Sequence, residues 1–492
     1  MTQPSTADDG TLIERVDPMA TASGEATAST GNLKGSLGVF GVIVMVVAAA
    51  APLSTIGGVA PVAIIAGNGP AFPIMYVAAA IILALFVVGF NAMTPFVKEA
   101  GAFYSYITLG LGRGLGLSAA YIAMLTYICV EIAVIAVLGA VFEGQIVSIG
   151  GPALPWWLWT AVFLAIVLLL GYRNIDFSGK VLAILVILEI AICMVLVIAV
   201  VVQGGSSEGL STAAFTPSAW LQGAPALGLM FGVSGFLGFE ATAIFRSEAK
   251  DPDRTISRAT YGALAVVGIF YAVVCWSMVS AWGDNNIVAK AEENPGELLS
   301  ASFGAYVGPL SQQIVQWLLI TSFFACVLAF HNVINRYLHT LAHKGLMPQA
   351  LGRTHPKQKS PYVAAIAQTI VIAVLLGVFA GLGYTPFDQI LSVTVGVSTL
   401  GFLLLMFLTC IGVLRFFRQD SRGVSPLRTL VFPLLGALAL GATVITTLLN
   451  ITVLVASQAL AIAAIIPIVV CIVIGPILVA VKPNLNADSP AT

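Results

Sequence analysis

Three carboxylates stand within long apolar runs of this chain. Glu131, Glu189 and Glu240 each lie inside a stretch of apolar residues, and no lysine or arginine lies deep in any such stretch to pair with them. In a medium of low dielectric, an unpaired carboxylate is costly as an anion and is favoured in its protonated form. Such a group can bind and release a proton when the cavity beside it changes sides, which makes all three proton-coupling candidates. The alternative is a neutral, hydrogen-bonded acid that only ties helices together.

Two of the apolar runs also contain helix-breaking residues. The first carries Pro52 and a Gly57-Gly58 pair, and the second carries three glycines between Gly232 and Gly238. A backbone that leaves the helix inside a bilayer exposes amide and carbonyl groups, which cost several kcal/mol each unless other groups pair with them. Interruptions at matching positions of two halves are typical of the binding site of a membrane carrier.

The two breaks offer complementary chemistry. The helical piece after Pro52 begins with free N–H groups that suit a carboxylate, and the piece before the second break ends in free carbonyls that suit an ammonium group. An α-amino acid would satisfy both breaks at once. The alternative is close helix packing through small residues. The substrate-binding candidates from these two segments are Ser54, Thr55, Gly57, Gly58, Ser234 and Gly235.

The elements that hold these groups must be membrane helices. The chain has 492 residues, of which 59% are hydrophobic and 9% are charged, whereas soluble domains carry about 25% charged residues. No basic face exists for nucleic acid, and no P-loop is present that would make ATP the energy source. The six cysteines lie in apolar runs without disulfide or metal spacing. We expect no cofactor and no metal site.

A hydrocarbon core about 30 Å thick needs about 20 helical residues, and by that measure the chain has twelve spans. A small, aromatic-rich stretch at residues 101–106 predicts a short helix near the membrane surface. The predicted spans are 37–66, 71–93, 117–141, 155–171, 180–202, 224–245, 258–282, 309–338, 362–381, 389–414, 429–450 and 458–481.

The placement of basic residues predicts the orientation. Twelve spans put both termini on one side, and of the 21 lysines and arginines only Lys290 falls on the other. The positive-inside rule therefore predicts both termini in the cytoplasm, and we expect the chain to lie in the plasma membrane. Residues 1–36 are polar and lack an apolar core, which predicts a disordered cytoplasmic tail. Residues 482–492 form the second tail.

Longer motifs carry a family resemblance. Gly238-Phe239-Glu240, followed by the charged stretch 248–258, resembles the sixth-span motif of the amino acid–polyamine–organocation permeases. The segments 100–106 and 332–348 resemble the family's motifs before the third span and at the end of the eighth. This chain departs from the family at Ser257, where the family often has proline, and in the residues of the first break, Pro52 to Gly58.

The resemblance implies an all-α, leucine-transporter-type fold. Residues 37–202 and 224–414 would be inverted repeats of five spans, with broken first and sixth helices, and 429–481 would form two peripheral spans. Ser234 stands where some members carry an aromatic that covers the substrate, so Phe231 and Phe236 join the substrate-binding candidates. Some proton-coupled members carry a lysine near the position of Glu189. That glutamate follows Lys180 by nine residues, about 13 Å of helix, which places it near the midplane.

The leading prediction is a secondary amino acid permease driven by protons. One alternative is a carrier for polyamines or other amines, in which Glu131 or Glu240 pairs with the extra ammonium group. Alternatives of another class are a channel and a membrane enzyme. His331, His339 and His343 share one face of the eighth span. The last two have zinc-compatible spacing without a third ligand, so a polar lining is favoured, and His331 could join a proton path. The sequence leaves the oligomeric state open.

Overall fold

The computed structural model describes residues 38–97, 102–173, 179–239, 251–358, 360–452 and 458–481. Both predicted tails, Glu240 and the first three residues of the charged stretch 248–258 lie outside these residues. The helices of the first half are α1 (Val39–Ala49), α2 (Pro52–Ser54), α3 (Ala60–Ala66), α4 (Pro73–Met93), α5 (Ala102–Leu111), α6 (Arg113–Ser148), α7 (Trp156–Tyr172) and α8 (Gly179–Gln203).

The second half is helical in the same way. Its longer helices are α9 (Pro217–Trp220), α10 (Pro225–Ser234), α11 (Pro252–Trp282), α12 (Ile287–Glu293), α13 (Leu298–Tyr306), α14 (Pro309–His343), α15 (Tyr362–Gly381), α16 (Ser392–Gln419), α17 (Phe432–Leu449) and α19 (Gln458–Val481). The short turns η1 (Thr55–Val59), η3 (Thr94–Phe96), η8 (Pro386–Leu391) and η9 (Leu427–Val431) extend several of these helices.

The predicted all-helical membrane architecture is confirmed. Among the described residues, nine helices are long and apolar enough to cross a bilayer. The other three expected ranges contain shorter apolar helices at Pro52–Ala66, Trp156–Tyr172 and Pro225–Ser234. Two of these are short because the helix is interrupted at a predicted break. The short helix expected near 101–106 is present as α5.

Proline marks where many of the helices begin. A proline at the first helical position lacks only an N–H that would be unpaired there in any case, and its fixed φ suits the helix. The sequence therefore encodes these starts locally. Helices that begin with proline include α2, α4, α10, α11 and α14.

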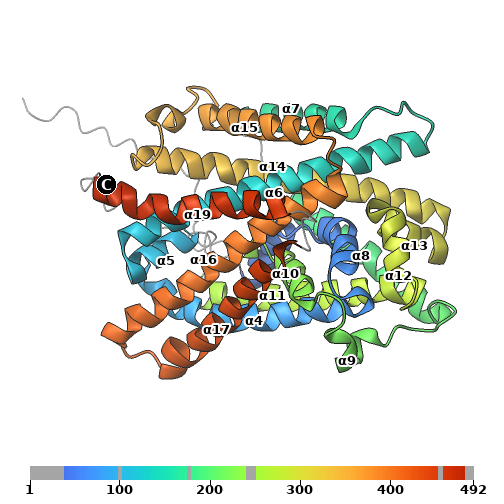
Figure 1. Cartoon of the computed structure of the whole chain (residues 1–492), viewed down its shortest axis with the longest axis horizontal. Coiled ribbons are helices and arrows are strands. Elements are labelled where there is room, and N and C mark those ends of the chain that lie inside the picture. The colour runs from blue at the N-terminus through green and yellow to red at the C-terminus, as the bar shows by residue number, and fades with distance from the viewer. Residues whose placement is uncertain are drawn as a thin grey trace, which may run out of the picture.

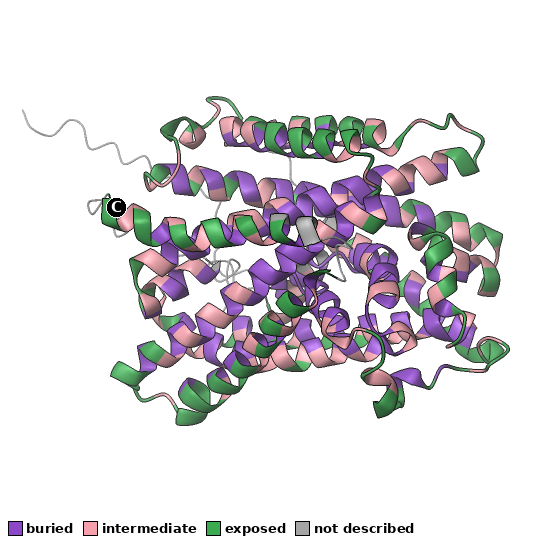
Figure 2. Ribbon diagram, viewed as in Figure 1, coloured by how far each residue is buried: buried purple, intermediate pink, exposed green. Residues whose placement is uncertain are grey.

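The long helices run side by side, roughly along the horizontal axis of Figure 1. α6 and α16 lie at the centre, with 72% of their most apolar stretches buried, against 17% for α19. α7 and α15 pack on each other along one edge, with exposed outer faces (Figure 2). α12 and α13 gather at one end of the bundle, and α5 lies at the other (Figure 1). The broken helices are thus enclosed by the bundle.

Small residues allow α5 to approach the central helix α16 closely. α5 crosses α16 where Gly110 faces the backbone of Gly412, and a Cβ at Gly110 would lie 2.4 Å from the Gly412 carbonyl oxygen. Backbone atoms cannot move aside as a flexible side chain can. This contact therefore requires glycine.

We predict that Gly110→Ala destabilises the protein by about 1–3 kcal/mol, because the added methyl group overpacks a backbone contact. The matched control is Gly377→Ala in α15, where an added Cβ meets no atom within 4 Å. The stability of each variant is measured by its thermal unfolding midpoint in detergent. Equal midpoints for the two variants would contradict the prediction.

Candidate functional site

The first break lies at Ala51, just before Pro52. Ala51 has a positive φ of 44°, in the left-handed region that non-glycine residues seldom adopt. The proline explains the position, because its ring disfavours the helical conformation for the residue before it. Gly57 and Gly58, which were expected to relax the chain, lie instead within the continuous π-helical turn η1. There an added Cβ would lie 2.7 Å from Leu319 Cδ1 or 2.8 Å from Phe323 Cζ. The two glycines therefore permit close packing on α14 rather than unwinding.

The carbonyl released at this break is paired by two hydroxyl groups. The Ala50 oxygen accepts hydrogen bonds from Thr55 Oγ1 at 3.2 Å and from Tyr271 Oη at 3.1 Å. Tyr271 comes from α11 and is fully buried. The break thus satisfies its carbonyl without water, as a low-dielectric interior requires.

The N–H group released at the same break is paired by a carboxylate. Leu53 donates its backbone N–H to Glu189 Oε2 at 3.1 Å, and Glu189 on α8 is 6% exposed. A carboxylate at a helix N-terminus interacts favourably with the partial positive charge there. The N–H end that was expected to receive a substrate carboxylate therefore already holds one from the protein.

A line of hydroxyl groups joins Glu189 to the residues after the break. Ser54 Oγ donates to Ser322 Oγ at 2.9 Å, and the Ser322 side chain also hydrogen-bonds to Glu189. Ser322 comes from α14. Neither Ser322 nor Tyr271 was predicted from the sequence. In the sequence, the only signal for Ser322 is that it is a polar residue within an apolar run.

The second break follows Ser234. α10 ends there, residues 235–238 form turns, and Gly238 has a φ of 102°. The Phe231 carbonyl accepts hydrogen bonds from the Ser234 hydroxyl at 2.7 Å and from the Gly235 N–H at 3.4 Å. Gly232, which was expected to unwind, stays in the helix. A Cβ there would lie 2.7 Å from the Met75 carbonyl oxygen, so this glycine allows α10 to pack on α4.

A cavity of about 60 Å³ lies between the two breaks. This volume holds a few water molecules but is well below the roughly 300 Å³ of the smallest usual ligand pockets. Apart from Ser54, Thr55, Ser234 and Ser398, its lining is apolar or glycine. The lining residues are Ala50, Ala51, Ser54, Thr55, Gly58, Val59, Val130, Ala133, Val134, Val137, Ser234, Leu237, Phe323, Cys326, Phe330, Leu391, Val395 and Ser398.

Four of the eight substrate-binding candidates line this cavity, namely Ser54, Thr55, Gly58 and Ser234. The other four do not. Gly57 faces α14 away from the cavity, and Gly235 packs between Tyr76, Thr55 and Tyr271. Phe231 and Phe236 are at most 1% exposed, and the Phe236 ring packs near Tyr271. In this conformation Phe330 and Phe323 of α14 are the aromatic rings at the cavity.

Glu131 belongs to a separate buried cluster. Its Oε1 lies 3.0 Å from His331 Nδ1, and its Oε2 accepts a hydrogen bond from Gln368 Nε2 at 2.8 Å. Glu131 and His331 are fully buried, and Gln368 is 2% exposed. The cluster lies behind the cavity, because the neighbouring residues Val130 and Phe330 are the ones that line it.

The three side chains of this cluster all contact one another. Gln368 Nε2 also lies 2.6 Å from His331 Nδ1, and 3.4 Å from the His331 carbonyl oxygen. Buried polar groups are stabilised by such mutual hydrogen bonds. Gln368 was not predicted from the sequence.

Among the described residues, the other candidates from the sequence form no further binding site. Glu240 lies outside the described residues. His339 Nε2 and His343 Nε2 are 3.1 Å apart, and Thr354 Oγ1 lies 3.1 Å from His339. Within the described part of the chain, no three histidine, cysteine or acidic side chains gather as metal ligands do.

Comparison with known proteins identifies relatives. The family model described as amino acid permease matches residues 38–486. A low-affinity putrescine importer of Escherichia coli K12 is 20% identical over 59% of this chain and 63% of its own length. A probable GABA permease of Pseudomonas aeruginosa is 26% identical over 62% and 64%. A branched-chain amino acid permease of Lactococcus lactis is 21% identical over 63% and 69%. The chain thus spans slightly less than two thirds of the first two relatives.

A solved structure shares the fold. The crystal structure of a manganese transporter mutant from Eremococcus coleocola superposes with a TM-score of 0.57 at 14% identity, covering 92% of this chain and 98% of that one. At this identity the likeness concerns the fold alone. It confirms the transporter-type helical fold predicted from the sequence.

The buried cluster generates a stability prediction. Replacing His331 or Glu131 by leucine leaves buried polar partners unpaired, which costs about 1–3 kcal/mol for each variant. Because the two side chains share one interaction, we expect the double variant to lose less than the sum of the single losses. Unfolding midpoints of the four proteins test this coupling. Strictly additive losses would show that the pair does not interact.

Proposed function

The chain belongs to the amino acid permease family, and on that premise we propose that it is a secondary active transporter of small neutral amino acids. The cavity between the two breaks carries this proposal. Its hydroxyl groups and the nearby backbone ends suit the amino and carboxyl groups of an α-amino acid, and its valines and phenylalanines suit an apolar side chain. The substrate would cross by alternating access, with both termini in the cytoplasm and the repeats 37–202 and 224–414 moving against each other.

The lining favours an amino acid over a polyamine. A second ammonium group in a dry cavity requires a carboxylate partner, and none of the lining residues is charged. Glu131 lies behind the cavity, where Gln368 and His331 already engage both of its oxygens. Because one relative is a putrescine importer, transport of an amine is the alternative function to test.

We assign the coupling proton to Glu189. Its carboxylate engages the N–H group at the first break and connects through Ser322 to Ser54, which lines the cavity. Substrate at the break and charge on Glu189 therefore act on the same hydrogen bonds. Glu131 is a weaker candidate, because its partners come from α14 and α15 and involve neither break.

The substrate assignment is tested with purified protein in proteoliposomes. We expect labelled alanine or valine to be taken up, with unlabelled neutral amino acids competing and putrescine failing to compete. Ser54→Ala should lower the apparent affinity by about tenfold, the effect of one lost hydrogen bond to a charged group. Gln349→Ala, in the short helix η7 (Gln349–Gly352) away from the cavity, is the control. Competition by putrescine alone would support the amine carrier instead.

The coupling assignment is tested by driving uptake with a pH gradient, acidic outside. We expect Glu189→Gln to abolish the response to the gradient while keeping exchange of substrate across the membrane, because glutamine keeps the shape but cannot release a proton. Glu292→Gln, on an exposed helix, should behave like the native protein. Gradient-driven uptake that is unchanged in Glu189→Gln would exclude Glu189 as the carrier and leave the substrate assignment intact.

A further inference from the structure

A second cavity, of about 520 Å³, lies away from both breaks. α4 with η3 forms its floor, the first turns of α11 form one wall, and η9 with the loop before it forms the other. We call it the Arg428 pocket. It is lined by Val88, Asn91, Ala92, Thr94, Pro95, Ile256, Ser257, Tyr261, Val424, Ser425, Leu427, Arg428 and Phe432.

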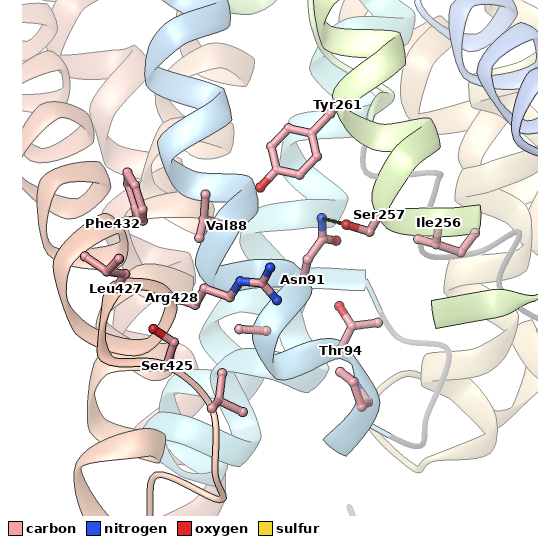
Figure 3. A pocket seen from close by; sticks show the side chains of 13 residues that line it. Val88, Asn91, Thr94, Ile256, Ser257, Tyr261, Ser425, Leu427, Arg428 and Phe432 are labelled. Atoms are coloured by element: carbon pink, nitrogen blue, oxygen red, sulfur yellow. Dashed lines mark hydrogen bonds between the residues drawn. The ribbon is translucent and has the colours of Figure 1, made fainter. Parts of the chain in front are cut away.

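The polar side chains of this pocket favour an anion. Arg428 is the one charged residue in the lining, and among the described residues no carboxylate forms an ion pair with it. Asn91 Nδ2 donates to Ser257 Oγ at 3.2 Å, and both side chains line the pocket. Figure 3 shows the Arg428 guanidinium extending toward Asn91, with the Tyr261 hydroxyl directed into the same space. Arginine and hydroxyl donors in this arrangement suit a phosphate group.

The helix dipoles do not decide whether the pocket prefers an anion or a cation. The helix that starts with η9 directs its positive end toward the pocket, while α4 ends there with its carbonyl groups. The two partial charges oppose each other. The net preference therefore comes from the full charge of Arg428.

The surroundings of the pocket are apolar and face outward. On η9 and α17, Leu427, Leu430 and Leu434 are 56%, 56% and 44% exposed, and on α11 Ile269 is 64% exposed. α11 and α17 both pack on α4. Between them α4 presents Ile81, which is 59% exposed, and one and two turns further on Leu85 and Val88. The apolar strip of α4 thus runs directly into the polar pocket.

A polar pocket that continues into an outward-facing apolar strip matches a phospholipid. We propose that the Arg428 pocket binds the phosphate of an anionic phospholipid, whose acyl chains lie along α4 between α11 and α17. The arginine selects a headgroup of net negative charge, because a choline or ethanolamine group would find no carboxylate in the lining. The pocket lies at the ends of α4 and α11 that the charge distribution assigns to the cytoplasm, which selects the inner leaflet.

The test uses the purified full-length protein and does not depend on transport. Phosphatidylglycerol, phosphatidylcholine and inorganic phosphate are added separately in detergent, and bound lipid is counted by native mass spectrometry together with the unfolding midpoint. We expect phosphatidylglycerol to bind and stabilise the native protein, and Arg428→Gln to weaken this binding about tenfold. Arg418→Gln, at an exposed arginine near the same end that does not line the pocket, should keep it. Val88→Trp, which fills the apolar entrance, should also lower binding.

Three outcomes would overturn the proposal. Equal losses in Arg428→Gln and Arg418→Gln would show general attraction to surface charge. Equal binding of phosphatidylcholine would show that the arginine selects nothing. Stabilisation by inorganic phosphate that matches phosphatidylglycerol at equal phosphate concentration would assign the pocket to a soluble anion.

Discussion

A backbone that leaves the helix inside a membrane must find partners for its N–H and carbonyl groups, and the arrangement around Pro52 follows from this constraint. The break releases the carbonyl of Ala50 and the N–H of Leu53. Thr55 and Tyr271 pair the first, and Glu189 pairs the second. These contacts draw α8 and α11 against the broken helix. Ser322 brings α14 to the same place through its contact with Ser54. The cavity lies beside this broken helix, where α6, α14 and α16 supply most of the remaining lining.

Local signals account for what the sequence predicted well. Runs of apolar residues indicate the spans, Pro52 indicates the first break, and the glycines up to Gly238 indicate the second. Each of these effects acts within a few residues. The interpretation of Gly57 and Gly58 was wrong in its mechanism for the same reason. A glycine pair allows either unwinding or close packing, and only the neighbouring Leu319 and Phe323 determine which occurs.

Long-range partners were not predictable from one sequence. Glu189 meets Leu53 across 136 positions, and Glu131 meets His331 across 200. The sequence indicated that these carboxylates lie in apolar spans without basic partners. It could not indicate that one caps a broken helix while the other joins an imidazole and an amide. In the proposed function, its contact with the broken helix suits Glu189 to coupling, whereas the contacts of Glu131 with α14 and α15 suit it to holding helices together.

The two sites therefore differ in how substrate could affect them. A substrate that enters the 60 Å³ cavity must enlarge it, and the break at Ala51 is the part of the lining least constrained by regular helix. In the proposed mechanism, a substrate carboxylate and ionised Glu189 compete for the N–H of Leu53. Protonation of Glu189 removes its negative charge and weakens its hold on that N–H, which favours the substrate. Proton and substrate then bind together and leave together, which is the thermodynamic requirement for symport rather than exchange.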